Sequence, residues 1–376
     1  MAGRPVRIRR AANEGVLIGS GAVVDELAAI VDSLGCTRVA LITTPSVAAS
    51  PLLEVAASAL GDRLVATFAE SRAHTPRPTV LDAARVAAAA DADGLVSLGG
   101  SSVVDLTKAV AMVLANGDDL DRLRDAGRGA MGPDALAHVA IPTTLSAAEF
   151  TAAAGVTDPS TGVKEVFGAA PLAPRWVMLD AAMTAHTPDR LWRGTGMKLV
   201  ADCLEGMLSR TATGFTDALL EAGLRTLLGD LGADRDDLAA RGRCLEAAHM
   251  TLSNLHNVGV GAVAALRHQI GGRCGVPHGE ASTIVLPHVM RWNGEAAQPV
   301  LDRIGSRLDW GGAASVVDRV AETITALGLP SRLRDVGVEQ QDLGPIAHHA
   351  ASEPAAVRNI RPATTEGLTE VLQAAW

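Results

Sequence analysis

Two charged residues, one helical turn apart, give this chain its first candidate chemistry. Lys198 and Asp202 lie in "GTGMKLVADCLEG" (194–206), whose apolar spacing predicts a helix. Because residues four apart share a helix face, the ammonium and the carboxylate can meet. A charged lysine can donate a hydrogen bond to a developing oxyanion, and a neutral lysine can act as a base or form a Schiff base. The same spacing also fits an amphipathic helix with a solvated polar stripe.

Lysine is rare in this sequence. Of the 33 basic residues only three are lysines, namely Lys108, Lys164 and Lys198. Lysine is a compact point charge whose pKa shifts on burial, whereas arginine is a planar fork that stays charged. A GC-rich genome would produce the same bias, so rarity alone does not assign a role. Tyrosine is absent, which excludes a tyrosine acid.

Two loops carry small or hydroxyl residues that suit a phosphorylated ligand. In "LVSLGGSSVVDLTK", a predicted strand passes through Gly99–Ser102 into a helix, whose free N–H groups can face a phosphate. In "AIPTTLSAAEFT", Thr143 and Thr144 follow the next strand, at the sheet edge where open α/β sheets bind ligands. The alternative for the first loop is an ordinary tight turn, and a hydroxyl-capped turn explains the second loop equally well.

Histidines supply the candidate proton donors. His268 and His278 flank "QIGGRCGVP" in the second half of the chain. A neutral or charged imidazole can carry a proton near neutral pH, although a hydrogen-bonded core histidine is the commoner case for either one alone.

These residues need elements to position them, and the chain supplies two kinds. The first half alternates short β-rich runs with helical patterns, which predicts a doubly wound, mostly parallel sheet. The expected strands span 37–43, 63–68, 94–99, 138–143, 163–168 and 175–180. Helical periodicity dominates after residue 185. The expected helices span 188–210, 214–231, 234–271, 280–291, 297–308, 313–327 and 340–351. We therefore expect an α/β domain over 1–182 and an all-α domain over 183–376, with the site in the cleft between them.

Composition limits the function classes. The 376 residues are 48% hydrophobic with a net charge of −9 and no basic tract, which disfavours nucleic-acid binding. No apolar run reaches the roughly 18 residues that a membrane span needs, and "MAGRPVRIRR" lacks the apolar core of a signal peptide. The four cysteines form no CxxC pair, so we expect reduced thiols and a cytoplasmic protein.

Several segments in order resemble one known family over nearly the whole chain. They are "LITTPS", "FAESRAHTP", "AIPTTLSAAEFT", "GTGMKLVADCLEG", "VPHGEASTIVLPHVMRWN" and "LGLPSRLRDVGVEQQDL". Together they resemble the iron-dependent alcohol dehydrogenase superfamily, whose fold is shared with dehydroquinate synthase, and within it the maleylacetate reductase-like branch. The resemblance implies an α/β doubly wound domain followed by an all-α domain, NAD(H) or NADP(H) as cofactor, and a homodimer.

The resemblance also implies cofactor-binding residues. Gly99, Gly100, Ser101 and Ser102 would hold the pyrophosphate. Asp105 would lie near the nicotinamide end. Thr143, Thr144 and Leu145 would flank the cofactor, and Lys164 would approach its ribose. No contact is implied for Lys108, which matches a lysine of the family's helix. The family's NAD-selecting acidic position falls on Pro45, so NAD and NADP both stay open.

The metal positions of the family are the clearest departure. Metal-dependent members hold a divalent cation with one aspartate and three histidines. In this chain those positions fall on Lys198, Asp202, Ala264 and His278. A cation normally needs at least three protein ligands, so we predict no catalytic metal.

The sequence thus predicts a metal-independent NAD(P)H-dependent reductase of an activated carbonyl or enone, maleylacetate reductase-like, serving aromatic degradation or secondary metabolism. Lys198, held by Asp202, would polarise the oxygen, and His268 or His278 would supply the proton. The expected substrate is a small anionic molecule held by Lys198 and Arg267. A non-redox lyase, isomerase or cyclase using Lys198 is the alternative, and a catalytically inactive binding subunit is a third.

Overall fold

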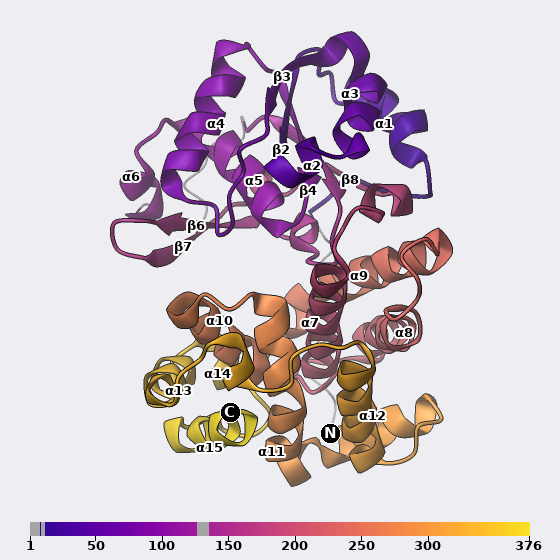
Figure 1. Cartoon of the computed structure of the whole chain (residues 1–376), viewed down its shortest axis with the longest axis vertical. Helices are drawn as coiled ribbons and strands as arrows, with labels where there is room; N and C mark the ends of the chain where they lie inside the picture. Colours follow the sequence, from indigo (N-terminus) through magenta and orange to yellow (C-terminus); the bar gives the residue numbers. More distant parts are fainter. Residues whose placement is uncertain (1–7, 9–11, 126–134) are drawn as a thin grey trace. The chain divides into compact units, whose positions relative to one another are not determined.

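The structure is a computed structural model that describes residue 8, residues 12–125 and residues 135–376 of the chain. It forms two compact units (Figure 1). The α/β unit comprises Ala11–Thr187 and Arg235–Glu246, and the helical unit includes Pro188–Asp234 and Ala247–Trp376. Each unit is described separately below.

The α/β unit is built on a parallel sheet of six strands in the order β1-β8-β5-β4-β2-β3. The strands are β1 (Gly15–Ile18), β2 (Val39–Thr43), β3 (Leu64–Phe68), β4 (Gly94–Gly99), β5 (Ala137–Pro142) and β8 (Trp176–Leu179). Every residue of β2 and β4 is buried, as expected for central strands covered on both faces. A separate antiparallel hairpin joins β6 (Ala153–Asp158) to β7 (Val163–Gly168).

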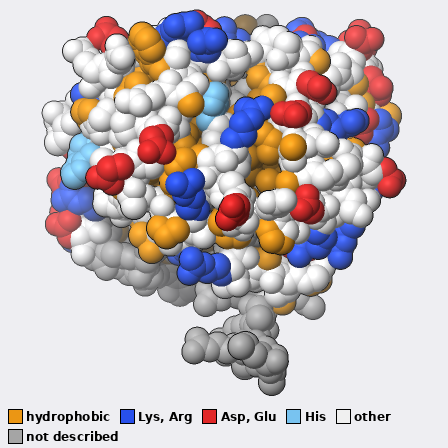
Figure 2. All heavy atoms as spheres, turned by 90° about the horizontal axis from the view of Figure 1, so that it is seen from below, with side chains coloured by type: hydrophobic (Ala, Val, Ile, Leu, Met, Phe, Trp, Pro, Cys, Tyr) orange, Lys and Arg blue, Asp and Glu red, His pale blue; other side chains and the backbone are white. Residues whose placement is uncertain are grey.

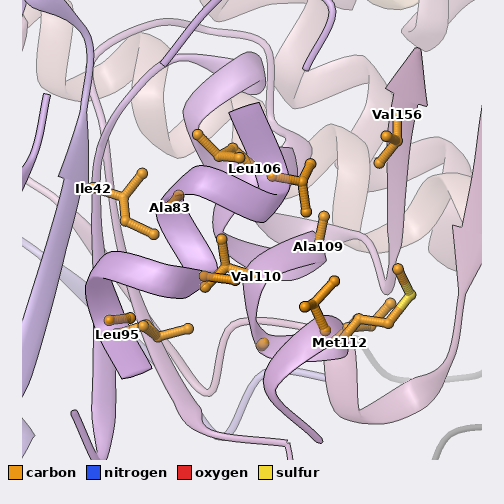
Figure 3. Packing of buried hydrophobic residues seen from close by; sticks show 14 of the residues in the cluster. Ile42, Ala83, Leu95, Leu106, Ala109, Val110, Met112 and Val156 are labelled. Atoms are coloured by element: carbon orange, nitrogen blue, oxygen red, sulfur yellow. The ribbon is translucent and has the colours of Figure 1, made fainter. Parts of the chain in front are cut away.

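Helices pack on both faces of this sheet. They are α1 (Ala22–Ser33), α2 (Pro45–Ala48), α3 (Pro51–Leu60), α4 (Arg77–Ala89), α5 (Ser101–Asn116) and α6 (Leu120–Asp125). Side chains of α1 and α3 form one hydrophobic cluster with the strands, and those of α4 and α5 form another. Figure 3 shows the second cluster, in which Leu106, Ala109 and Val110 of α5 pack among residues of the neighbouring elements. Because α5 is buried along most of its length, its first turn is firmly placed.

The helical unit contains the long helices of the second half. They are α7 (Asp189–Met207), α8 (Gly214–Asp230), α9 (Leu238–Val258), α10 (Ala262–Cys274), α11 (His278–Arg307), α12 (Ala313–Ala326), α13 (Leu343–Ala351), α14 (Pro354–Arg358) and α15 (Thr365–Ala375). The first turns of α9 belong to the α/β unit. The helix α7 packs against α8 and α11, and α10 packs against α11 and α13.

The sequence predicted most of these elements, with one clear error. The expected single helix 234–271 is wrong, because it is two helices, α9 and α10, separated at Gly259–Gly261. Gly259 has a φ of 83°, a left-handed conformation that ends a helix and that glycine adopts without strain. The sequence predicted a break between two helices, one ending at residue 291 and the next beginning at 297. The structure has this break at Gly294, whose φ of 50° interrupts α11. The strands β1 and β6 and the helices α14 and α15 had not been predicted.

The surface carries mixed charge. The face in Figure 2 shows acidic and basic side chains next to one another, with hydrophobic side chains between them. Among the described residues, no helix is both long enough and apolar enough to cross a bilayer.

Candidate functional site

The two predicted ligand loops lie side by side at the carboxyl edge of the sheet. Strands β4 and β5 pair in register, with Gly99 opposite Pro142, so the loops that follow them are neighbours. The N–H of Thr143 donates to the carbonyl of Gly99 over 3.1 Å. A Cβ on Gly100 would lie 3.1 Å from the side chain of Thr144, so glycine lets the loops approach closely. Leu145 is fully buried beside them.

The start of α5 is suited to an anion. Its N-cap is Gly100, and no side chain caps the helix. Ser101 and Ser102 therefore begin the helix with backbone N–H groups that no capping side chain satisfies. The positive end of the helix dipole and these N–H groups together favour a phosphate at this position. The residues predicted to hold a pyrophosphate thus occupy a turn that fits one.

The other two predicted cofactor residues meet at Gly155 on the hairpin. The N–H of Gly155 donates to the carboxylate of Asp105 over 3.2 Å. Lys164 on β7 crosses the bare backbone of Gly155, since its Cε lies 2.2 Å from where a Cβ would stand. His74 lies close enough that the charge of Lys164, after burial, helps to lower the pKa of the imidazole.

Lys108 is a buried structural residue, a role the sequence did not assign. Its Nζ donates to the carbonyls of Ala148 and Ala153 over 2.7 and 2.9 Å and to Oγ1 of Thr151 over 3.0 Å. Burial lowers the pKa of Lys108, and Asp105 opposes that effect. The lysine therefore fixes the segment that leads from the Thr143 loop into the hairpin.

In the helical unit, Lys198 and Asp202 form the ion pair that their spacing predicted. Their Nζ and Oδ2 atoms are 2.7 Å apart. Arg267 of α10 donates to the other oxygen, Oδ1, over 2.7 Å. Asp202 is completely buried, which alone would raise its pKa, but Arg267 and Lys198 outweigh burial and hold the pKa below its usual value. The carboxylate thus stays charged and holds both cations.

This arrangement excludes one alternative and corrects one expectation. The polar stripe of α7 is not a solvated face, because Asp202 and Glu205 are both buried. Arg267 is also buried and committed to Asp202, so it does not present a free guanidinium to an anionic substrate. Lys198 keeps 15% of its side-chain surface exposed. Of the two cations that bind Asp202, Lys198 is therefore the one that a ligand can reach.

Glu205 connects the same cluster to α10. Its place in the polar stripe of α7 was its only signal in the sequence. Its carboxylate accepts from the N–H of Val263 over 2.7 Å and of Ala264 over 3.3 Å, at the first turn of α10. Burial raises the pKa of Glu205 to about 7, although Arg267 and the backbone donors act in the opposite direction. A carboxylate on a helix N-terminus stabilises the helix, so Glu205 fixes the helix that carries Arg267.

Two glycines, Gly194 and Gly279, bring the start of α11, and with it His278, next to α7. A Cβ on Gly279 of α11 would lie 2.6 Å from the backbone of Gly194 on α7. The helices therefore touch backbone to backbone one turn before Lys198, with His278 at the first position of α11. The rings of His278 and His268 have centroids 5.5 Å apart. The structure thus brings the two histidines together, as it does Lys198 and Asp202.

Comparison with known proteins agrees with this architecture. The family model described as "Iron-containing alcohol dehydrogenase" matches residues 13–181. The family model described as "Fe-containing alcohol dehydrogenase family, C-terminal" matches residues 194–376. The chain belongs to the iron-containing alcohol dehydrogenase family. Its fold is the two-domain fold of that family, and its relatives are oxidoreductases.

Two curated relatives and one solved structure show where this chain belongs within the alcohol dehydrogenase family. Maleylacetate reductase of Burkholderia cepacia is 29% identical, over 96% of this chain and 95% of its own. Lactaldehyde reductase of Escherichia coli is 30% identical, over 76% of this chain and 77% of its own. The crystal structure of maleylacetate reductase from Agrobacterium tumefaciens is 28% identical and covers 100% of this chain and 99% of its own, with a TM-score of 0.83. These similarities confirm the maleylacetate reductase-like branch.

The residues present do not fit the divalent cation that the family's name implies. Asp202 would have to leave two cationic partners to become a ligand, and the ammonium of Lys198 would repel the metal. Ala264, one of the family's histidine positions, has no donor atom. Among the described residues no three histidine, cysteine, aspartate or glutamate side chains form a metal-binding group.

Proposed function

We propose that this enzyme is a metal-independent, NAD(P)H-dependent reductase of an activated carbonyl or enone, similar to maleylacetate reductase. The observation that carries the proposal is the Lys198–Asp202–Arg267 cluster, in which Lys198 and Asp202 occupy two of the positions that hold the metal in metal-dependent members of the family. A divalent ion would polarise a substrate oxygen there. A fixed ammonium donates to the same developing negative charge.

The α/β unit would hold the cofactor. Gly99, Gly100, Ser101 and Ser102 would receive the pyrophosphate at the start of α5. Thr143, Thr144 and Leu145 would flank the cofactor on the next loop. Asp105 on α5 would lie near the nicotinamide end of the cofactor, and Lys164 on the hairpin would approach its ribose. The bound nicotinamide supplies the hydride.

In the helical unit, Lys198 would bind the substrate oxygen and orient it. Asp202, which Arg267 holds in place, pairs with the ammonium of Lys198, so little reorganisation is needed when charge develops on the substrate. A reduction adds a hydride to carbon and a proton to oxygen. His278 or His268 would release that proton, and the imidazole would regain it from water.

The geometry favours redox chemistry over the alternative of a lysine nucleophile. Lys198 lies 2.7 Å from a charged carboxylate, and an ammonium in such a bond is a hydrogen-bond donor. A Schiff base needs the free amine, which this carboxylate disfavours. An anionic substrate remains part of the proposal, with Lys198 as its cation.

The test is turnover. Purified enzyme, stripped of metal with chelator, is mixed with NADH or NADPH and a panel of keto acids, aldehydes and enones such as maleylacetate. We expect oxidation of the nicotinamide at 340 nm with at least one activated carbonyl. Cofactor binding without oxidation across the whole panel would contradict the reductase proposal. A substrate-dependent lysine adduct trapped by borohydride would support the non-redox alternative instead.

A further inference from the structure

His268 has a carboxylate partner on a segment far away in the sequence. Its Nδ1 lies 2.8 Å from Oε2 of Glu353, the residue that precedes α14. The other carboxylate oxygen, Oε1, accepts from the amide of Gln269 over 2.6 Å. Both oxygens of Glu353 are therefore engaged by consecutive residues of α10, which fixes the plane of the carboxylate.

Glu353 does not perform the local task that its position suggests. It is the N-cap residue of α14, yet its side chain does not cap that helix. Instead the side chain reaches across to α10 and is 19% exposed, while His268 is 41% exposed. Pro354 at the first position of α14 needs no hydrogen bond on its nitrogen, which leaves Glu353 free for this contact.

The bond has a chemical consequence for the ring. A carboxylate accepts from an N–H, so Glu353 selects the form of His268 that carries hydrogen on Nδ1. The Nε2 nitrogen then remains for exchange with another partner. The neighbouring ring is His278, with centroids 5.5 Å apart and planes inclined by 45°. At this separation a proton can pass between imidazoles directly or through one water.

We propose that Glu353 is a positioning residue that fixes the orientation and the tautomer of His268 beside His278. The inference rests on the proposed function and makes it more specific. His278, at the start of α11 next to α7, would deliver the proton to the substrate oxygen. His268, the exposed member, would return a proton to His278 and take one from water, with no net change in the pair. Gln269 holds the carboxylate in place.

Three variants of the full-length enzyme test the proposal. In Glu353→Gln the side-chain amide offers one acceptor and one donor. Because the Nδ1–H of His268 and the amide of Gln269 are both donors, one of these two hydrogen bonds is lost. We expect kcat for the carbonyl substrate to fall about tenfold or more with KM within about twofold, as when a proton-transfer group is misoriented. Glu353→Asp keeps the charge and should recover part of the rate. Asp342→Asn is the matched control, because it breaks another 2.7 Å ion pair of α10, with Arg273, away from His268. It should keep wild-type kcat.

Nitrogen-15 NMR of the histidines gives a readout that does not depend on turnover. The His268 signal, assigned by its loss in His268→Gln, should show hydrogen on Nδ1 in the wild type and a mixture of tautomers in Glu353→Gln. Unchanged tautomer and unchanged kcat in Glu353→Gln would overturn the proposal, as would an equal loss of kcat in Asp342→Asn. A wild-type enzyme that reduces no carbonyl would overturn the proposed function, and the NMR comparison would then decide the positioning role alone.

Discussion

Exposure separates the chain's three lysines. Lys108 has no exposed side-chain surface, whereas Lys198 keeps 15% and Lys164 lies on an exposed strand of the hairpin. Lys108 donates to two carbonyls and a hydroxyl of its own unit, and Lys198 meets a carboxylate that a second cation also holds. One residue type therefore has three surroundings, and each predicts a different measurable effect.

Substitution of Lys198 should affect turnover. Lys198→Met removes the donor to the substrate oxygen, and we expect kcat/KM to fall by about 10² to 10³, the range for loss of one oxyanion donor. Lys198→Arg keeps the charge but replaces a point donor with a planar fork, so it should recover only part of the activity. Steady-state kinetics with a carbonyl substrate provides the measurement. Full activity in both variants would mean that the ion pair serves structure alone.

Substitution of Lys108 should affect stability. Lys108→Met removes a buried donor that holds the part-buried carbonyls of Ala148 and Ala153 and the hydroxyl of Thr151, and we expect the free energy of unfolding to fall by about 2–4 kcal/mol. Urea unfolding followed by circular dichroism measures the change. Lys164→Met is the control, since an exposed substitution should change stability by less than about 0.5 kcal/mol. The control should instead weaken NAD(P)H binding, measured by fluorescence titration. Equal destabilisation by both variants would contradict the assignment.

The sequence predicted side-chain contacts only between residues that are close together in the chain. Lys198 and Asp202 meet because i and i+4 share a face, which the sequence shows directly. The contact of Asp202 with Arg267 joins positions 65 residues apart, and that of His268 with Glu353 joins positions 85 apart. Such pairs depend on how helices pack, so no local pattern reveals them. The sequence consequently assigned Arg267 to the substrate, where the structure assigns it to Asp202.

At the scale of elements, α10 depends on groups supplied by other helices. Its N-cap, Gly261, has no side chain, and the carboxylate of Glu205 on α7 accepts from the first turn instead. Asn359, beyond α14, accepts from the N–H of Ala262 over 3.2 Å. The error over 234–271 arose here, because the apolar periodicity continues through the glycines that end α9. A cap borrowed from a distant helix leaves no signature in the sequence around α10.

The buried carboxylate of Glu205 makes stability depend on pH. Its pKa in the folded chain, about 7, is above the ordinary 4.5, so the folded state holds the proton more tightly than the unfolded state does. This contribution to stability is complete below about pH 4.5 and is lost as the pH rises through about 7. Glu205→Gln cannot ionise, so we expect its melting temperature to rise relative to wild type between pH 5 and pH 8.

Differential scanning fluorimetry at four pH values between 5 and 8 measures this difference. Glu322→Gln on α12, an exposed glutamate on a helix that packs against α11, removes one carboxylate and serves as the control. A difference between Glu205→Gln and wild type that stays constant with pH, or that falls as the pH rises, would contradict the linkage.

For the whole molecule, the family determines the fold, and particular side chains determine the chemistry. The alternation of strands and helices predicted the parallel sheet, and the late helical periodicity predicted the all-α part, because these patterns reflect burial along each element. The small hairpin β6–β7 was only half predicted, since β6 reads "AAGVTD" and carries little β-forming signal. Its Gly155 is required by Lys164, a constraint from outside the strand.

The charge balance of the helical unit leads to a last prediction, about metal. Lys198 and Arg267 already neutralise Asp202, and Glu205 is engaged by the α10 backbone, so a divalent cation would meet net repulsion at this cluster. We expect dialysis against EDTA to leave kcat unchanged within about twofold, and added Fe²⁺ or Zn²⁺ to give no gain. The matched variant is Lys198→Asp with Asp202→His and Ala264→His, which restores the family's ligand types at these three positions and keeps His278. Elemental analysis after dialysis should find metal in that variant well above the wild-type level. Chelator-sensitive turnover of the wild type, restored by one of these ions, would show that the cluster binds a cation despite its charge.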